Sequence, residues 1–313
     1  MSDDMGKLHE EFMNECRYVS ALSSETLRGY QHSFDLLMKI MPTLTIDTIC
    51  TKTITEFFRR LGERERTVGK GQTRKGIRKT TVATYRSKLN KFFVWLESRG
   101  HIKENPFRKM EYPSVQYEDR KYLKKEPMER IFTALVMGDT ANQLVRKRNL
   151  VIFSLLLYCG LRKGELLGLR VYDVDLGRRI LMVRGETSKS KRDRTIPINT
   201  KVFMALQDYL GERKKHRQLS PSLLVSNNCD QAFTVHGLKH LVAKLKSITG
   251  VNFHVHQLRH TFAVNLINNG TDIAKVKQLM GHTDIRMTMA YLRCLPTKSM
   301  RADVEALELD NLV

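Results

Sequence analysis

The sequence contains little cysteine and no paired cysteine motif. Its five cysteines are an odd number and none forms a C-x-x-C pair, which argues against both a disulfide framework and a zinc ribbon. They are Cys16, Cys50, Cys159, Cys229 and Cys294. We therefore expect them to be small hydrophobic side chains of a protein in a reducing cytosol.

Long apolar runs are also missing. The longest, residues 150–159, is interrupted by Ser154 and has about half of the roughly 20 residues that a membrane-spanning helix needs. The chain begins with acidic residues that lead into no apolar stretch, so neither a secretory signal nor an Arg-rich transit peptide is expected. These absences predict a protein that spans no membrane and stays where it is made.

Acidic side chains are outnumbered by basic ones. The chain has 54 Lys and Arg against 33 Asp and Glu, a formal net charge of +21, which suggests a polyanionic partner such as nucleic acid or an anionic membrane surface. The charge is uneven: residues 1–50 carry four basic and eight acidic side chains, whereas residues 51–100 carry fourteen basic and four acidic. With 313 residues, of which 41% are hydrophobic, the chain is long enough for two domains.

Helical periodicity over residues 1–110 predicts a small all-helical domain. Apolar residues recur at intervals of three and four over 27–41 after a capping serine, Ser24, and a second helix is expected over 53–61. Beyond the Gly/Lys-rich connector 69–72, a third helix starting near Thr80 has an apolar inner face. Its outer face and the residues before it are basic and are expected to contact a phosphate backbone. These DNA-binding candidates are Arg78, Lys79, Arg86, Lys88 and Lys91.

In the second part of the chain the spacing of the apolar residues changes. Residues 111–125 have linker character, and a second domain is expected over 126–296, with helices at 127–136 and 141–159. Two short apolar segments, 179–183 and 194–198, predict a hairpin before helices return at 202, so the fold class is mainly α with a small β-sheet. The last segment, 297–313, has an apolar stripe at helical spacing and could pack on its own domain or on a neighbouring protomer.

Four clusters of chemically capable residues lie in the second domain. They are residues 159–165, 188–194, 256–260, and 279–282 followed by Tyr291, nine residues after His282. Together, in this order and spacing, they resemble the active site of the tyrosine recombinase (phage integrase) family. The resemblance covers the second domain nearly end to end, and the first domain resembles the helical core-binding domain of that family. It implies a mixed α/β catalytic domain.

Arg162 and Glu165 belong to the first cluster. Arg162 follows Gly160 at the end of an apolar helix, a rigid place for a fixed positive charge, although a surface arginine after a helix-ending glycine fits the same pattern. Glu165 could orient a basic side chain or lie on a helix surface. The resemblance assigns Arg162 to the first arginine box of the family, Gly160-Leu161-Arg162-x-x-Glu165.

His256 and Arg259 are three residues apart and share one face of a predicted helix. With His260, His256 forms an i, i+4 histidine pair that could suggest a metal, but the zinc-peptidase pattern needs a glutamate where Gln257 stands. The resemblance implies that His256 and Arg259 are site residues and His260 a buried structural neighbour. His254 is the rival for the histidine role.

No cluster of carboxylates offers a two-metal site, so the nucleophile of a phosphodiester displacement is expected to be a side chain. The resemblance implies that this nucleophile is Tyr291 and that His282 donates to the phosphate or its leaving group. Packing for Tyr291 and a helix-capping role for His282 are the plainer alternatives. Aligned on residues 194–197, the lysine of the family, which protonates the leaving 5′ oxygen, falls on Lys189, with Lys191 two residues away.

The resemblance implies site-specific DNA recombination through a 3′-phosphotyrosine intermediate, with neither ATP nor metal and no cofactor. The expected partners are double-stranded DNA with inverted-repeat core sites, a homo-tetramer on two duplexes, and accessory proteins. The expected location is cytoplasmic and nucleoid-associated. The likeness is greatest to compact, Xer-like recombinases and mobile-element integrases without an arm-binding domain. The alternatives are a type IB topoisomerase and a catalytically idle DNA-binding regulator.

Overall fold

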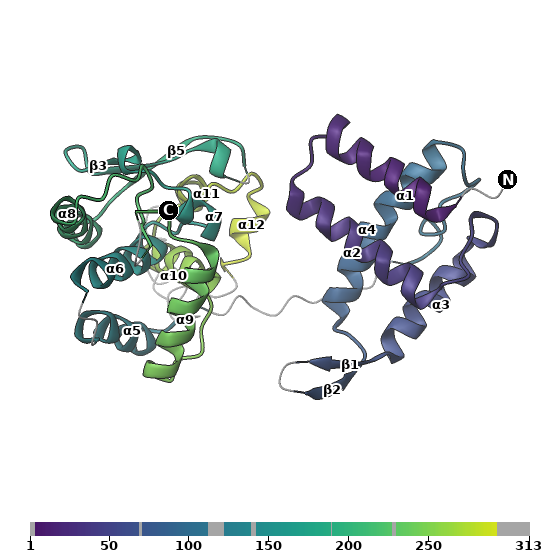
Figure 1. Ribbon diagram of the computed structural model, residues 1–313, viewed down its shortest axis with the longest axis horizontal. Coiled ribbons are helices and arrows are strands. Elements are labelled where there is room, and N and C mark those ends of the chain that lie inside the picture. Colours follow the sequence, from purple (N-terminus) through teal and green to yellow (C-terminus); the bar gives the residue numbers. More distant parts are fainter. Residues whose placement is uncertain are drawn as a thin grey trace, which may run out of the picture. The chain divides into compact units, whose positions relative to one another are not determined.

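The computed structural model describes residues 4–68, 71–111, 122–138, 142–188, 190–226 and 230–292. The chain divides into two compact units, Met1–Glu118 and Asp119–Val313 (Figure 1). Helices dominate both, and the described strands form one two-stranded and one three-stranded antiparallel sheet. The predicted fold class, mainly α with little β-structure, is confirmed. Most of the linker predicted over 111–125, and the whole tail predicted over 297–313, lie outside the described residues.

The N-terminal unit is built on four main helices. They are α1 (Met5–Asn14), α2 (Ser24–Ile40), α3 (Thr51–Glu63) and α4 (Lys79–Ser98), with short helical turns at Glu15–Val19 and Ile46–Thr48. The apolar stripes predicted for α2 and α4 pack these helices against each other, with Phe34, Phe92 and Phe93 in the core. Helix α1, which was not predicted from the sequence, packs against both. Ser23 caps α2, one residue before the serine expected to do so.

The N-terminal unit is not all-helical, contrary to the expectation from the sequence. Strands β1 (Glu65–Val68) and β2 (Gln72–Lys75) pair as an antiparallel hairpin where a plain connector was predicted. Their described side chains are all exposed, so the segment lacks the alternation of apolar and polar residues by which a strand is recognised. Gly71 supplies a positive φ of 78° at the turn.

Arg86 does not lie on the outer face of α4, where it was predicted from the sequence. It is three and seven residues before Leu89 and Phe93, so helical geometry puts it on the buried side. Its guanidinium donates to the carbonyl oxygens of Met110 and Glu111, and the side chain therefore joins α4 to the segment that follows Ile102. Arg86 is a structural residue of this unit.

The C-terminal unit surrounds one apolar helix. Its helices are α5 (Lys125–Met137), α6 (Gln143–Tyr158), α7 (Lys163–Leu167), α8 (Thr200–Lys215), α9 (Val235–Thr249), α10 (Val255–Asn268), α11 (Ile273–Met280) and α12 (Arg286–Met289), with short turns at Val171–Asp173 and Gly185–Thr187. Helix α6 is buried along most of its length and packs against α5, α8 and α10 (Figure 1). Among the described residues, no helix is both long and apolar enough to cross a membrane.

The sheet of this unit contains the predicted hairpin. Strands β4 (Ile180–Val183) and β5 (Arg194–Pro197) pair antiparallel, with Leu181 opposite Ile196, and both of these side chains are buried. A third strand, β3 (Val174–Asp175), pairs with the other edge of β4. With two residues this strand is too short to give a periodic signal, so it was not predicted from the sequence.

The described cysteines are all free, and two of them behave as expected. Cys16 and Cys159 are buried, and burial raises the pKa of the Cys159 thiol to about 12. Cys50 is different, because it is exposed at the N-terminus of α3 with its sulfur 3.0 Å from Oγ1 of Thr53. The expectation of a small hydrophobic side chain does not fit Cys50, which is exposed and polar in its contact.

Candidate active site

The first arginine of the site projects from a tight turn between α6 and α7. Gly160 has a φ of 60°, and a Cβ there would lie 2.2 Å from the ring of Phe262, so only glycine fits between α6 and α10. Arg162, two residues later, is the N-cap residue of α7, and its side chain keeps 20% of its surface exposed. The turn thus holds a partly exposed guanidinium next to the buried core.

A buried carboxylate, Glu165, lies at the centre of the site. It accepts the backbone N–H and Nη1 of Arg162 at 2.8 and 2.7 Å, and Nη2 and Nη1 of Arg194 at 2.7 and 3.1 Å. The hydroxyl of Ser188 donates to it at 3.3 Å, and Nη1 of Arg259 is 3.8 Å away. Burial by itself would raise the pKa of Glu165, but the hydrogen bonds and positive charge of Arg194 and Arg162 hold it at about 2. Glu165 is therefore an ionised anchor for arginines rather than a surface carboxylate.

The three arginines around Glu165 also share a second anchor. Each donates to one of three consecutive backbone carbonyls at the C-terminal end of α11: Arg194 Nε to Leu279 at 3.0 Å, Arg259 Nη2 to Met280, and Arg162 Nη2 to Gly281 at 3.0 Å. These carbonyls have no acceptor role inside the helix and carry its negative dipole end, so cations stabilise them. A helix end and one carboxylate together fix the positions of three guanidiniums.

Arg259 is the most deeply buried of the three, with 1% of its surface exposed. Its Nη1 donates to the carbonyl of Gly160, and it therefore ties α10 to the turn that carries Arg162. Burial, and next the positive charge of Arg162, lower the pKa of Arg259 to about 9. It is still a cation at neutral pH.

Tyr291 follows α12 and is also buried, with 1% of its surface exposed. Its hydroxyl is hydrogen-bonded to Nδ1 of His260 at 2.8 Å. The ring of His282 lies nearly parallel to that of Tyr291, at 4° and 6.4 Å between centroids, and Thr288 Oγ1 is 2.8 Å from His282 Nδ1. Tyr291, His260 and His282 thus form one cluster in the same unit as the arginines.

His256 contacts this cluster from the first turn of α10. It is exposed, and its ring meets that of His260 edge to face, with centroids 4.4 Å apart. His254, its rival, is the N-cap residue of α10, and its backbone N–H donates to the side chain of Gln257. The structure therefore places His256, rather than His254, in ring contact with the residue that holds Tyr291.

Lys189 lies outside the described residues, and the choice between Lys189 and Lys191 stays open. Ser188, directly before it, donates to Glu165 as described above. Lys191 is exposed and has a positive φ of 52°.

The side-chain contacts of Arg194 and His260 were not predicted from the sequence. Arg194 served only to align the hairpin, yet its side chain is 8% exposed and binds both Glu165 and α11. His260 was expected to be a buried structural neighbour; it is buried, and it also contacts the hydroxyl of the candidate nucleophile. A charged residue at the start of a strand gives no sequence signal for such contacts, because they join segments 29 and 85 residues apart.

The site borders a basic cavity of about 630 Å³ between the β4–β5 hairpin and α11. Its lining includes three cations, Arg192, Arg194 and Lys277, against one carboxylate, Asp193. His282 lines it as well, so net positive charge lies beside the histidine cluster. Such a cavity suits an anionic group.

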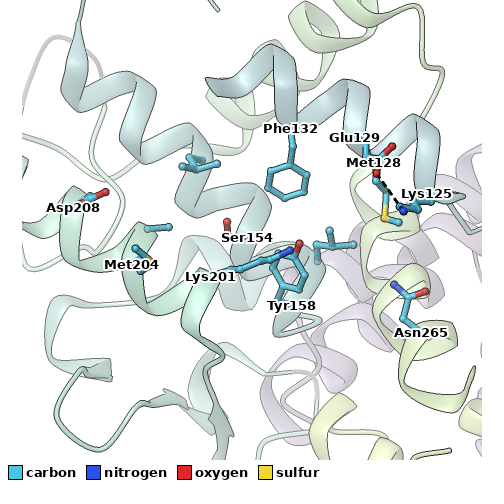
Figure 2. Close-up of a pocket in the computed structure, with 13 residues that line it drawn as sticks. Lys125, Met128, Glu129, Phe132, Ser154, Tyr158, Lys201, Met204, Asp208 and Asn265 are labelled. Atoms are coloured by element: carbon cyan, nitrogen blue, oxygen red, sulfur yellow. Dashed lines mark ion pairs between the residues drawn. The ribbon is translucent and has the colours of Figure 1, made fainter. Parts of the chain in front are cut away.

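A second cavity, of about 560 Å³, lies among α5, α6, α8 and α10 and is shown in Figure 2. Its walls are largely apolar, with Phe132 of α5, Tyr158 of α6, Met204 of α8 and Asn265 of α10 around it. None of the described site residues lines this cavity, which distinguishes it from the candidate active site.

Of the DNA-binding candidates in the N-terminal unit, Arg78, Lys79 and Lys91 are exposed. Lys88 is half-buried and reaches over Gly29, where a Cβ would lie 2.6 Å from its Nζ. Arg78, Lys79, Lys88 and Lys91 form a basic surface at the start of α4 and along it. Arg86 is buried and is not part of this surface.

Comparison with known proteins matches both units. The phage integrase family model matches residues 121–297, and the phage integrase N-terminal SAM-like domain matches residues 10–100. The tyrosine recombinase XerC of Thermodesulfovibrio yellowstonii is 30% identical over 290 residues, which are 90% of this chain and 89% of that protein. A tyrosine recombinase of Thermosipho africanus is 30% identical over 293 residues, 92% of this chain and 95% of that protein.

Solved structures share the fold. The Tn1549 transposon integrase in complex with transposon right end DNA matches with a TM-score of 0.74 and 21% identity, covering 98% of this chain and 99% of that one. The XerH site-specific recombinase in a post-cleavage complex with palindromic difH substrate matches with a TM-score of 0.72 and 17% identity. The match covers 94% of this chain and 82% of that one.

The chain belongs to the phage integrase family. The expected resemblance is confirmed over both units. Within that family it is an enzyme of the tyrosine recombinase class, and site-specific recombination is favoured over topoisomerase-like relaxation or idle DNA binding.

Proposed function

We propose that the protein cuts and rejoins double-stranded DNA with Tyr291 as the nucleophile. The observation that carries this proposal is the clustering within one unit of three arginines around buried Glu165 and of Tyr291 with His260 and His282. Fixed positive charge beside a nucleophilic hydroxyl is what displacement at a phosphodiester requires.

In the proposed reaction the Tyr291 oxygen attacks the scissile phosphorus, and the bond to the 5′ oxygen breaks. The phenol loses its proton to the histidine cluster, and the leaving 5′ oxygen gains one from Lys189, or from Lys191 as the alternative. The products are a 3′-phosphotyrosine and a free 5′-hydroxyl. Because the phosphotyrosine ester conserves the energy of the broken phosphodiester bond, attack on it by a 5′-hydroxyl of another duplex rejoins the DNA without ATP and releases Tyr291.

Arg162 and Arg259 are the proposed donors to the non-bridging oxygens, and His282 donates to the phosphate or leaving group. Their carbonyl and carboxylate anchors support this role, because donors already held in place need no reorganisation during attack. The positive charge of the arginines can balance the transition state without a metal ion or other cofactor.

Attack requires a movement of the nucleophile. Tyr291 and Arg259 are each 1% exposed, so a DNA phosphate cannot reach them while both stay as they are. We infer that the segment carrying α12 shifts when DNA binds and thereby exposes the Tyr291 hydroxyl to the phosphate.

The proposed partners follow from the charge and from the relatives. A net charge of +21 and the basic surface of α4 suit a duplex, and related recombinases have been solved with core-site DNA. We propose inverted-repeat core sites, a homo-tetramer on two duplexes with accessory proteins, and a cytoplasmic, nucleoid-associated protein of the Xer or mobile-element type. Exchange of the segment 297–313 between protomers would link neighbouring sites.

Recovery of a covalent adduct tests the chemistry. The protein is incubated with fragmented genomic DNA of its host, with chelator and without ATP, and is then denatured, captured and digested. We expect DNA linked to the peptide that contains Tyr291, a recurring cleavage sequence, and no adduct from Tyr291→Phe. Adducts from Tyr291→Phe, or a strict need for metal, would contradict the proposal.

A plasmid that carries two copies of the recovered sequence separates the related activities. A recombinase exchanges the segment between the copies, a topoisomerase only relaxes the plasmid, and an idle regulator binds without cutting. We expect exchange, and relaxation alone would favour the topoisomerase.

A further inference from the structure

The β1–β2 hairpin of the N-terminal unit has no evident role in the folding of that unit. Every described side chain of its two strands is exposed, so none of these side chains belongs to the apolar core of the unit. Its base is closed by the backbone hydrogen bond from Gly76 to the carbonyl of Arg64 at 2.9 Å. Figure 1 shows the hairpin projecting from the helices of its unit. An isolated two-stranded hairpin is only marginally stable in water, so a contact made elsewhere is expected to stabilise it.

The register of the hairpin places like charges together. Glu65 is opposite Lys75, Arg66 opposite Arg74, Thr67 opposite Thr73, and Val68 opposite Gln72. Directly opposed residues share a face, so Arg66, Arg74 and Gln72 lie on one side and Glu65, Lys75 and the threonine pair on the other. Opposed like charges destabilise a strand pair, which makes the arginine pair costly for the isolated hairpin.

Among the described residues, neither Arg66 nor Arg74 lies in an ion pair with a carboxylate. The one acidic residue of the strands, Glu65, is on the opposite face. The hairpin therefore presents two arginines and an amide on one exposed face, and an anion bound there would relieve their repulsion.

We propose that the β1–β2 hairpin is a second DNA-binding element, which enters the major groove with the face of Arg66, Arg74 and Gln72 toward the duplex. The major groove, about 12 Å wide, admits a two-stranded ribbon, and arginine and glutamine are side chains that bind phosphates or base edges there. Arg78 and Lys79, of the basic surface on α4, follow β2 within four residues, so the two elements are continuous in the chain. The proposal rests on the DNA-binding part of the proposed function.

Salt dependence of DNA binding tests the proposal. Arg66→Ala/Arg74→Ala is compared with wild type by fluorescence anisotropy on a 40-base-pair duplex of fixed sequence, between about 50 and 300 mM salt. If both arginines contact phosphates, the slope of log affinity against log salt falls by about 1.8. The matched control, Arg59→Ala/Arg60→Ala, removes two arginines of α3 that already pair with Glu56, and we expect it to change the slope less than half as much.

Two further measurements sharpen the result. Lys75→Ala changes a residue on the opposite face, beside Glu65. It is expected to change the slope less than either single variant, Arg66→Ala or Arg74→Ala. Methylation by dimethyl sulfate reports the groove: the arginine variant should lose protection at guanine N7, in the major groove, and not at adenine N3, in the minor groove. The thermal unfolding midpoint should not fall, because no described side chain of the hairpin is buried.

Each remaining outcome overturns the proposal. A wild type that does not bind the duplex overturns both this proposal and the DNA-binding part of the proposed function. A wild type that binds, with a variant of unchanged slope, overturns the hairpin proposal alone. If the arginine variant binds DNA as the wild type does but is no longer retained on immobilised poly-glutamate, the hairpin binds an acidic protein instead. If the variant loses protection only at adenine N3, the assignment to the major groove is wrong.

Discussion

The hydroxyl of Tyr291 lies 2.8 Å from Nδ1 of His260, and both residues are buried. His260 directly follows Arg259, so one turn of α10 supplies both an arginine anchored beside Glu165 and the residue that holds the tyrosine. A change in the position of α10 would therefore alter the arginine cluster and the nucleophile together.

The first prediction concerns His260. His260→Ala removes the hydrogen bond to Tyr291, and we expect formation of the covalent adduct to slow by at least tenfold, whereas DNA affinity stays nearly unchanged. His260→Asn, which can place a polar atom near the position of Nδ1, should recover part of the rate. Single-turnover adduct formation on a nicked duplex measures both variants. Equal rates for Ala and Asn would mean that His260 acts by packing alone.

The second prediction concerns Arg162. Arg162→Ala removes a donor that is anchored at both Glu165 and Gly281, and cleavage should slow by roughly 10²-fold. Binding should weaken much less, because a fixed donor acts mainly in the transition state. Lys163→Ala, at the exposed neighbouring position, is the control and should leave the cleavage rate of bound DNA unchanged. Equal losses in binding and cleavage for Arg162→Ala would make it an ordinary phosphate contact.

The third prediction concerns Arg194 and Glu165. Arg194→Ala leaves Glu165 buried with part of its charge unbalanced, so we expect a loss of about 3 kcal/mol in the free energy of unfolding. Glu165→Gln in the same chain should reduce that loss, because the uncompensated charge is gone. A double-mutant cycle by urea unfolding measures the coupling between the two positions, and strict additivity would show that they do not interact.

The fourth prediction concerns the basic surface of the N-terminal unit. Replacing Arg78, Lys79, Lys88 and Lys91 by alanine should lower the salt slope of DNA binding by about 0.9 for each phosphate that the variant no longer neutralises. Arg86→Ala should instead lower the thermal unfolding midpoint, since Arg86 is buried. Anisotropy titrations and thermal scans on both variants distinguish the two effects. An unchanged slope in the fourfold variant would mean that α4 does not face DNA.

The fifth prediction concerns pH and His9 of α1, whose ring stacks on Phe34 at 3.8 Å. Burial lowers its pKa from 6.5 to about 4, more than the nearby charge of Asp35 raises it. Below pH 6.5 the unfolded chain takes up a proton that the folded unit refuses, so stability present above pH 6.5 is lost as the pH falls toward 4, by up to about 3 kcal/mol. His9→Phe should lose this part of the pH dependence. Urea unfolding followed by the fluorescence of the single tryptophan, Trp95, measures it, and parallel pH profiles would contradict the assignment.

The sequence by itself determined the local elements and the order of the chemistry. Periodic apolar residues predicted most helical regions of both units, though not α1, because this signal depends on near neighbours along the chain. The spacing of Arg162, His256, Arg259, His282 and Tyr291 carried the family resemblance. The β1–β2 hairpin escaped prediction because its exposed strands show no apolar alternation. Arg86 was misplaced because a charged side chain on an apolar helical face was taken to point outward.

Only the tertiary structure decided which side chains meet. Glu165 joins arginines from α7, β5 and α10, and those arginines donate to carbonyls at the end of α11, far away in the sequence. The hydrogen bond between His260 and Tyr291 spans 31 residues in the same way. Such contacts are fixed by how the helices pack, since the guanidiniums and carbonyls carry no signal of their partners in their own segments. The sequence therefore determined the residues of the site, and the packing of α6, α10 and α11 decided their arrangement and the burial of the nucleophile.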